Sequence, residues 1–440
     1  MDCNTLTDFR QSLFACFGNG KDALMNLVDA LLTAPDARSF AELSLAPLFV
    51  RRWPSLYEAL DDARIDEAAL QRLFITTALQ IREAPCAQEQ AQEPFTFAGD
   101  ASSILRPQSP TLPDRSLVHA ANLPAAAAPV APGWQYGVLS ALPQTPSSWT
   151  LTLSVRRIPS GQTPSQAIAA QLHDVAPDLP AGSRVLLDGA FGNAAFVQRV
   201  ADLTLGKLMR TANNRVLYLP APPPTGRRGR PAKDGARFAF ADARAHPVPA
   251  DAWSGKSVSG EALDVACWHD LHFKACRAFP VTAIRIHLSE QARVYWLLWQ
   301  GAGMPPLSQV WDVYRRRFSI EHGFRFDKQA LLWEAPRLRT PARFTLWSWV
   351  VAAVHNLLTV ARPLVAAVRR PWERAVHLAS PQQVRRALGP IIGQVGTPAR
   401  PPRVRGKSPG RAKGFRCRPS PRFAVIRKTS GKKKCQPILV

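Results

Sequence analysis

The most informative segment of the chain is WDVYRRRFSIEHGFRFDKQALLW, residues 311–333. It contains one glycine and no proline, so it is regular enough to form a helix of several turns. At about 100° per residue, a stripe roughly 60° wide on such a helix would hold four polar side chains: Tyr314, Arg317, Glu321 and Lys328. A glutamate in this setting can hold a divalent metal ion while the surrounding cations, including Arg325, bind phosphate.

A surface helix with a salt-bridged face would show the same charges, and most charged helical stripes are of that kind. The order of the residues favours another interpretation. Tyr, two residues, Arg, three residues, Glu, six residues and Lys resemble the Y-R-E-K signature of DDE transposases of bacterial insertion sequences. The resemblance implies that Glu321 is a metal-binding carboxylate. It also implies that Tyr314, Arg317 and Lys328 contact the DNA backbone near the cut.

Two upstream aspartates are needed to complete such a site. FTFAGD predicts a short strand that ends at Asp100, and RVLLDG predicts an apolar strand followed by Asp188. Functional side chains in open α/β sheets lie beyond the carboxyl ends of strands. Taken separately, Asp100 is better explained as a turn residue and Asp188 as a helix cap. Together with Glu321 they favour a catalytic triad of carboxylates.

The predicted order of elements agrees with this interpretation. Strand candidates begin near residues 95, 133, 148 and 184, and a helix with a threonine cap begins at Thr163, before the fourth strand. Strand, strand, strand, helix, strand, with acidic residues on the first and fourth strands, resembles the RNase H-like α/β fold, a mixed sheet with flanking helices. The likeness to the transposase group covers roughly residues 95–360. It includes further positions: Arg106, Asp114, Arg115, His119, Gly133, Trp134, Gly189, Ala190 and Phe191.

Asp188 and Glu321 lie 133 residues apart, which is more than one connecting helix needs. The gap indicates a β-rich insertion at about 205–300, and the resemblance implies that such an insertion supplies an aromatic side chain that stacks on a DNA base. Trp296, Trp299 and Trp253 are candidates, although each could be an ordinary core residue. Arg228 and Arg230, in a Pro-rich loop, resemble an AT-hook and are more simply interpreted as phosphate contacts.

The ends of the chain differ in composition. Residues 1–90 predict a helical domain, which the resemblance implies binds DNA ends or dimerises. Residues 91–385 are predicted to form the catalytic domain, and residues 386–440 a basic tail. From residue 397 onward the chain has fourteen Lys or Arg and no acidic residue, so it is expected to be disordered and to bind phosphates without sequence preference.

The overall charge also predicts the partner. A net charge of +24 and a pI near 10.7 point to a polyanion, above all double-stranded DNA. Seven cysteines without a CxxC pair predict neither a disulfide framework nor a zinc site, so a cytoplasmic, nucleoid-associated protein is expected. The apolar segment 346–368 contains His355, Asn356 and Arg362, and this favours a buried helix over a membrane span.

The predicted chemistry is phosphodiester cleavage. Two Mg²⁺ ions about 4 Å apart, which Mn²⁺ can replace, activate the attacking oxygen and neutralise the leaving one. In this arrangement Asp100 bridges both ions, and Asp188 and Glu321 hold one each. The resemblance implies a cut-and-paste transposase that works as a homodimer on DNA. Two alternatives stay open: a metal nuclease of the same fold that never joins ends, and a non-catalytic DNA-binding repressor derived from a transposase.

Overall fold

The computed structural model describes most of the chain, namely residues 3–83, 93–120, 129–223, 231–291, 293–366, 368–373, 379–403, 410–427 and 437–438. Arg228 and Arg230, the two arginines of the AT-hook-like loop, lie outside the described residues.

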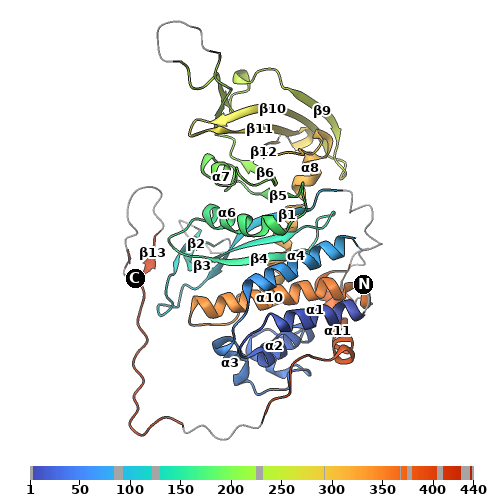
Figure 1. The fold of residues 1–440 in the computed structure, drawn as a ribbon, viewed down its shortest axis with the longest axis vertical. Helices are drawn as coiled ribbons and strands as arrows, with labels where there is room; N and C mark the ends of the chain where they lie inside the picture. The colour runs from blue at the N-terminus through green and yellow to red at the C-terminus, as the bar shows by residue number, and fades with distance from the viewer. Residues whose placement is uncertain are drawn as a thin grey trace.

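A mixed sheet forms the centre of the molecule (Figure 1). Its strands run in the order β4-β3-β1-β5-β6, with β1, β3 and β4 antiparallel and with β5 and β6 parallel to β1. The bounds are β1 (Thr96–Leu105), β3 (Val130–Ala141), β4 (Leu151–Ile158), β5 (Arg184–Leu187) and β6 (Gly206–Thr211). Helix α6 (Pro164–Val175) connects β4 to β5, and its N-cap Thr163 forms the expected capping box with Gln166. The predicted RNase H-like arrangement is therefore confirmed.

Strand β1 is longer than the sequence predicted. It was expected to end at Asp100 but continues to Leu105, because β3 pairs with it from Phe97 to Leu105. Its parallel partner β5 is much shorter, and that pairing ends at Gly99 and Leu187. Asp100 therefore lies at the point where β5 ends while β1 continues. A second short strand, β2 (Ser116–His119), pairs with β3 and was not predicted.

The insertion continues the central sheet. Beyond β6 the strand order is β12-β11-β10-β7-β8, and β9 pairs with β10 at the side. The bounds are β7 (Val216–Tyr218), β8 (Arg237–Ala239), β9 (Asp251–Lys256), β10 (Ala262–Phe273), β11 (Cys276–Leu288) and β12 (Arg293–Gln300). The sequence placed the start of the insertion near residue 205, but β6 is parallel to β5 and so belongs to the central sheet. The inserted strands are the ones that follow it.

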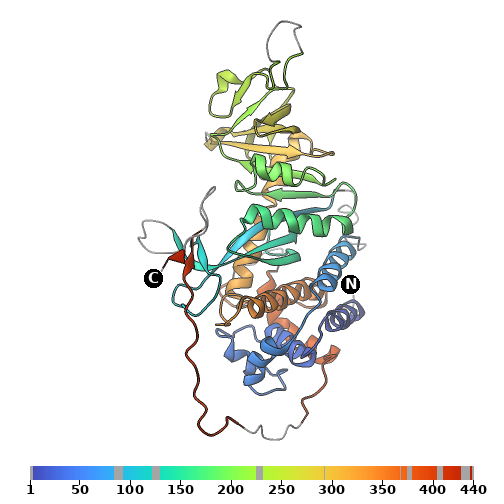
Figure 2. The same cartoon turned by 60° about the vertical axis from the view of Figure 1, so that its left-hand side comes forward.

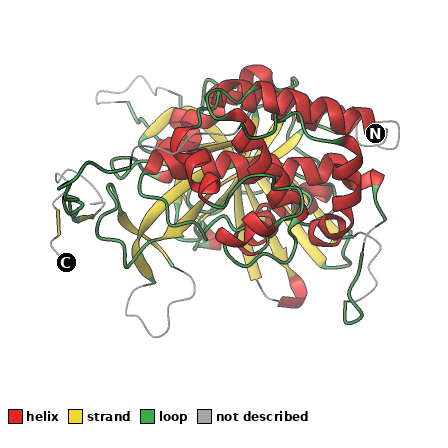
Figure 3. Cartoon of the chain, turned by 90° about the horizontal axis from the view of Figure 1, so that it is seen from below, coloured by secondary structure: helices red, strands yellow, loops and turns green. Residues whose placement is uncertain are grey.

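The N-terminal helices cover one face of the sheet together with helix α10 (Pro341–Ala361) (Figures 2 and 3). They are α1 (Cys3–Ala15), α2 (Lys21–Thr33), α3 (Pro54–Asp62) and α4 (Glu67–Glu83). One hydrophobic cluster contains side chains from these helices, such as Leu27 and Phe74, as well as Tyr136 of β3 and Trp347 of α10. The predicted helical domain therefore shares its core with the catalytic sheet. On the other face of the sheet, α6 and α7 (Ala194–Arg199) form a second core with the strands.

Helix α10 accounts for the most membrane-like segment of the sequence. Residues Pro341–Leu364 are long and apolar enough to span a membrane, but 89% of their most apolar window is buried inside the protein. His355 and Asn356, both buried, bond to the strand region that α10 covers: Asn356 exchanges two hydrogen bonds with the backbone of Thr152. This burial and polar pairing are typical of a core helix.

The signature segment is not one helix, as predicted, but two. Helix α8 (Leu307–Arg315) and helix α9 (Phe318–Gln329) are separated by a turn at Arg316 and Arg317. The amides of Arg316 and Arg317 bond to carbonyls three residues back, which tightens the turn and shifts the helical phase. As a result, α8 packs against the inserted strands, whereas α9 packs against β1.

The C-terminal segment is partly ordered. Residues 386–395, which the sequence assigned to the tail, lie in helix α11 (Pro381–Val395), and this helix packs on α2. Farther along, β13 (Val425–Ile426) adds to the free edge of β2. β14 (Pro437–Ile438) in turn pairs with β13.

Candidate active site

Asp100 and Asp188 are neighbours on adjacent parallel strands. The last paired residues of β1 and β5 are Gly99 and Leu187; Asp100 is the next residue of β1, and Asp188 is the first residue after β5. Adjacent strands lie about 4.8 Å apart, and side chains at paired positions point to the same face. Side chains alternate between the two faces, and a Cβ at Gly99 would contact Ile168 of α6, so Asp100 points to the opposite face, where α9 packs.

Asp188 is not the cap of a helix, and Asp100 is not a turn residue. Asp188 accepts a bond from the amide of Ala190, but the cap of the following helix α7 is Asn193. Asp100 lies within β1 rather than in a turn, and its Oδ1 accepts a bond from the amide of Ala101. Both side chains retain oxygens that no described residue binds tightly, so both are available to a cation.

Glu321 is joined to Asp100 through Arg317. The Arg317 guanidinium donates from Nη2 to Oε1 of Glu321 at 2.8 Å, and its Nη1 lies 3.4 Å from Oδ2 of Asp100. The side chain of Arg317 is 6% exposed, whereas that of Glu321, one helical turn along α9, is 52% exposed. The structure thus places Asp100 and Glu321 on either side of one buried cation, with Asp188 beside Asp100 at the end of the neighbouring strand.

The electrostatics of this cluster are dominated by Asp100. Burial, together with the nearby charges of Asp188 and Glu321, raises the pKa of Asp100 to about 7, against the opposing effect of Arg317. A carboxyl group whose ionisation is resisted by neighbouring carboxylates is typical of a site that binds a cation. The pKa of Arg317 is raised in turn by Tyr314, Asp100 and Glu321, although burial opposes the shift.

Tyr314 lies beside Arg317 at the end of α8. Its side chain is 1% exposed, and its hydroxyl has no hydrogen-bond partner among the described residues. Burial raises the pKa of Tyr314 to about 12, despite the nearby charges of Arg317 and Arg210. The phenol is therefore a neutral donor at physiological pH, and a buried unpaired hydroxyl is costly unless a ligand satisfies it.

The remaining cations of the signature differ in their surroundings. Lys328 donates to the carbonyl of Ser103 on β1 at 2.8 Å and pairs with Glu334 at 2.6 Å. It therefore lies three residues along β1 from Asp100. Arg325 is exposed, and at four residues from Glu321 it shares that side of α9. Lys328 is held close to β1, whereas Arg325 faces solvent.

Two contacts that the sequence did not reveal fix the position of α9. Asp327 pairs with the buried His355 of α10 at 2.7 Å, and the other ring nitrogen of His355 bonds to the carbonyl of Ser148. Gly323 lies so close to Thr150 that an added Cβ would be 2.6 Å from its Oγ1. Both contacts join residues more than 25 positions apart, so no local pattern could have predicted them.

Arg210 is a further cation near the carboxylates that sequence analysis missed. The pairing of β5 with β6 ends at Leu187 and Met209, so Arg210 follows in register beside Asp188. Its guanidinium lies 5.0 Å from the ring centre of Tyr295 and lowers the pKa of Tyr314. The segment GKLMRT, residues 206–211, has the length of a strand and follows a helix after Asp188, so β6 could have been predicted. The sequence alone did not connect its Arg210 with the carboxylates.

The proposed base-stacking tryptophans are a wrong prediction. Trp296 is 1% exposed and stacks on Phe240 with ring centres 4.3 Å apart, and Trp299 is 3% exposed. Trp299 packs against Gly206, where an added Cβ would lie 2.4 Å from its ring. Neither ring has a free face for a base, because both complete the core of the inserted sheet. Trp253, on β9, is only partly buried.

The donor set suits a hard divalent cation. Three carboxylates supply the oxygen ligands that Mg²⁺ and Mn²⁺ prefer, and their mutual repulsion would be relieved by such an ion. As the side chains stand, no three acidic, histidine or cysteine residues in the described ranges are close enough to hold a metal ion together. The guanidinium of Arg317 lies between Asp100 and Glu321, so metal binding requires that it move aside.

The chain is similar to a protein family and to a solved structure. A solved structure, the piggyBac transposase synaptic complex with hairpin DNA, matches 90% of this chain and 79% of its own at 12% identity, with a TM-score of 0.41. No curated protein matches the chain. The sequence model of the DDE superfamily endonucleases matches residues 12–269, a range that includes Asp100 and Asp188 and stops before Glu321. Because this match covers more than half of the chain, the protein belongs to the DDE superfamily endonuclease family.

Proposed function

We propose that this endonuclease is a transposase that cuts DNA at the ends of a mobile element and joins the freed 3′-OH ends to target DNA. The observation that supports the proposal is that Arg317 bridges Asp100 and Glu321, while Asp188 directly follows β5 beside Asp100. Membership of the DDE endonuclease family supports phosphodiester chemistry at this place. The order of Tyr314, Arg317, Glu321 and Lys328 supports the finer assignment to the Y-R-E-K group.

The three carboxylates would hold the metal, which we propose is a pair of Mg²⁺ ions that Mn²⁺ can replace. Asp100 feels the charges of both Asp188 and Glu321, so it is the carboxylate best placed to hold a metal ion together with either of them. When bound, the ions would lower the pKa of the attacking oxygen and neutralise the leaving one. Binding requires ionised Asp100, so the proton that its pKa near 7 retains must leave first.

The chain's own cations would hold the phosphate. Arg317, released from Glu321, offers a planar fork to the phosphate oxygens, and the buried phenol of Tyr314 offers a neutral donor. Arg210 lies beside Asp188, on the other side of the carboxylates from Lys328. Cations on both sides fix a phosphate in line with the attacking oxygen, which lowers the entropic part of the barrier.

Double-stranded DNA is the proposed partner. A net charge of +24 favours a polyanion, and neutralising phosphates releases counterions. We further propose that the DNA complex contains a homodimer, since two ends must be cut, and that the protein acts at the nucleoid in the cytoplasm. The N-terminal helices, whose core is continuous with the sheet, would then hold the end of the element close to the carboxylates.

A strand-transfer assay separates the proposal from its closest alternative. A duplex with a pre-cut 3′-OH end, taken from inverted repeats flanking the coding region, is incubated with a supercoiled target and Mg²⁺ or Mn²⁺. We expect joined products with the wild type and none with Asp188→Asn. The exposed Asp178→Asn is the matched control and should join normally.

Each alternative predicts a different result in this assay. Cleavage without joining of the pre-cut end would favour a nuclease that lacks strand transfer. Unchanged DNA binding with neither cleavage nor joining, for both wild type and Asp188→Asn, would favour a repressor derived from a transposase.

A further inference from the structure

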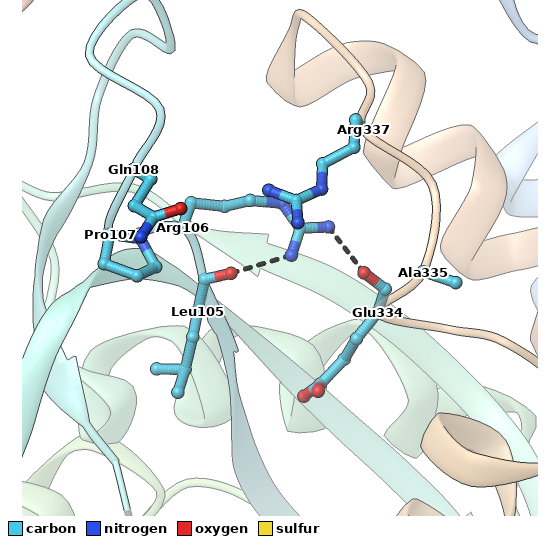
Figure 4. A pocket seen from close by; sticks show the side chains of 7 residues that line it. All are labelled: Leu105, Arg106, Pro107, Gln108, Glu334, Ala335 and Arg337. Atoms are coloured by element: carbon cyan, nitrogen blue, oxygen red, sulfur yellow. Dashed lines mark hydrogen bonds between the residues drawn. The ribbon is translucent and has the colours of Figure 1, made fainter. Parts of the chain in front are cut away.

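A pocket of about 360 Å³ lies at the far end of β1 from Asp100 (Figure 4). Its walls come from two segments distant in sequence: the end of β1 with the loop that follows, and the loop after α9. The lining residues are Leu105, Arg106, Pro107, Gln108, Glu334, Ala335 and Arg337. None of them belongs to the carboxylate site, so the pocket needs a separate explanation.

Two guanidinium groups meet at this pocket. Arg106 is 5% exposed and is held in place by the carbonyls of Leu105, Glu334 and Pro336. Arg337 is exposed and has no ion-pair partner in the described part of the chain. Figure 4 shows the Arg337 side chain reaching over Arg106. Burial lowers the pKa of Arg106 to about 10; the Glu334 charge opposes the shift, and the Arg337 charge adds to it. Two like charges side by side favour an anion between or beside them.

The one acidic residue of the pocket offsets this charge only in part. The carboxylate of Glu334 pairs with Lys328 at 2.6 Å, and Figure 4 shows it pointing away from Arg337. Only its backbone carbonyl bonds to Arg106. Glu334 and Lys328 neutralise each other, and the remaining charges of the pocket are those of Arg106 and Arg337. The amide side chain of Gln108 adds a neutral donor at the rim.

The pocket continues a row of cations along one strand. Arg317 contacts Asp100, Lys328 contacts the carbonyl of Ser103, and Arg337 lies at the pocket bounded by Leu105. The five residue-to-residue steps from Asp100 to Leu105 span about 17 Å of extended strand. At about 3.4 Å per base pair, that length corresponds to roughly five base pairs of DNA.

We propose that this pocket binds a backbone phosphate of the DNA about five base pairs from the cut, with Arg337 as the direct contact and Arg106 as the fixed positive wall. The inference rests on the proposed function for the direction of the DNA, and it adds a second phosphate site to the one at the carboxylates. The pocket would set the register of the duplex on β1, since phosphate contacts position a protein along DNA without reading its sequence.

The first test measures binding in EDTA, so that it does not depend on cleavage. The affinity for a 40-base-pair duplex is followed by fluorescence anisotropy from 50 to 200 mM NaCl. Arg337→Gln should bind roughly threefold to tenfold more weakly at intermediate salt, and the slope of log K against log salt should fall by about 0.9. Arg339→Gln is the matched control, because Arg339 is exposed on the same loop and does not line the pocket.

The second test locates the phosphate. Single neutral methylphosphonate linkages are placed three to eight base pairs from the pre-cut end. One position should weaken the wild type but have no further effect on Arg337→Gln, which is the signature of a direct pair in a double-mutant cycle. Titration with inorganic phosphate should show no saturable binding.

The outcomes separate this proposal from the proposed function. Equal losses of duplex affinity for Arg337→Gln and Arg339→Gln would show that diffuse surface charge binds the DNA. That result would overturn the pocket as a phosphate site, whatever the cleavage assay shows. Saturable, Arg337-dependent binding of inorganic phosphate with unchanged DNA affinity would assign the pocket to a free anion and also overturn the proposal. A protein that neither cuts nor joins DNA, but whose duplex binding depends selectively on Arg337, would refute the transposase activity alone.

Discussion

Arg317 is bonded to Glu321 across one turn of α9 at 2.8 Å, and the same guanidinium reaches Asp100 on β1. An arginine thus serves as the counter-ion of two carboxylates that the proposed chemistry assigns to the metal. The arrangement keeps these two carboxylates close together. In the proposed reaction, a metal that replaced Arg317 at the carboxylates would free its guanidinium for the substrate phosphate.

Replacement of Arg317 should make folding stability depend on metal. Arg317→Ala leaves Asp100 and Glu321 without their cation, and we expect a loss of about 1–3 kcal/mol in urea unfolding at pH 8. Mn²⁺ should then stabilise the variant more than the wild type, because the metal no longer competes with the guanidinium. Arg325→Ala, on the exposed side of the same helix, is the control. A variant that Mn²⁺ stabilises no more than it does the wild type would refute this exchange.

The pKa of Asp100 predicts how stability varies with pH. It is raised from 3.8 to about 7 on folding, so the folded state binds the proton more tightly and loses stability as pH rises between these values. Asp100→Asn removes this effect and should be more stable than the wild type at pH 8, by roughly 4 kcal/mol at most, and not at pH 4. Urea unfolding at both pH values measures the difference, and an equal difference at both would contradict the shift.

The same pKa predicts the pH dependence of activity. Metal binding needs the ionised carboxylate, so Mg²⁺-dependent cleavage should rise with pH through about 7. Saturating Mg²⁺ should move the midpoint to lower pH, because the metal competes with the proton. A cleavage rate that is flat between pH 6 and pH 8 would be inconsistent with Asp100 as a ligand.

The His355–Asp327 pair should stabilise the protein most at low pH. Burial lowers the pKa of His355, but the charge and hydrogen bond of Asp327, together with the bond to the carbonyl of Ser148, raise it overall. Because the pKa of His355 is raised on folding, the pair contributes its full stabilisation below about pH 6.5. This stabilisation is lost as the pH rises through the folded-state pKa of His355. We expect His355→Gln to cost about 3–5 kcal/mol at pH 5.5 and less at pH 9, by urea unfolding. A cost that grows with pH would refute a charged pair.

The close packing of Gly323 on Thr150 predicts a rescue experiment. Gly323→Ala improves helix propensity by about 1 kcal/mol, but its Cβ would lie 2.6 Å from Thr150 Oγ1, and overpacking costs about 1–3 kcal/mol. We expect α9 to shift and cleavage to fall, since Glu321 lies on the same helix. Thr150→Ala should restore cleavage in the double variant. Full activity of Gly323→Ala alone would show that α9 tolerates the displacement.

Local patterns predicted the elements that carry the carboxylates. The strands around Asp100 and Asp188 and the capped helix at Thr163 have clear local signals, and the topology follows from their order. The lengths were harder to predict: β1 runs past Asp100 because residues 133–141 of β3 pair with it, and so distant a pairing leaves no mark on the local sequence. The break between α8 and α9 was missed for a similar reason, since Arg316 and Arg317 are good helix formers.

Residue roles were less predictable than elements. The sequence favoured Trp296 and Trp299 as base contacts because of their residue type, whereas their burial is decided by strands that surround them in the fold. Arg210, Asp327 and His355 carry no motif, and only the register of β6 and the packing of α10 bring them to the site. The cation row along β1 likewise depends on the loop after α9, which has no recognisable pattern.

Metal-dependent cleavage by the wild type and Asp188→Asn tests the central claim most directly. The substrate is DNA that carries the flanking ends of the element, and the readout is cleavage with Mg²⁺ and with EDTA, beside DNA binding measured in EDTA. We expect the wild type to cut at the ends only with Mg²⁺, and Asp188→Asn to bind equally well without cutting. Cleavage by Asp188→Asn at the wild-type rate would contradict the assignment of the carboxylates as the site of chemistry.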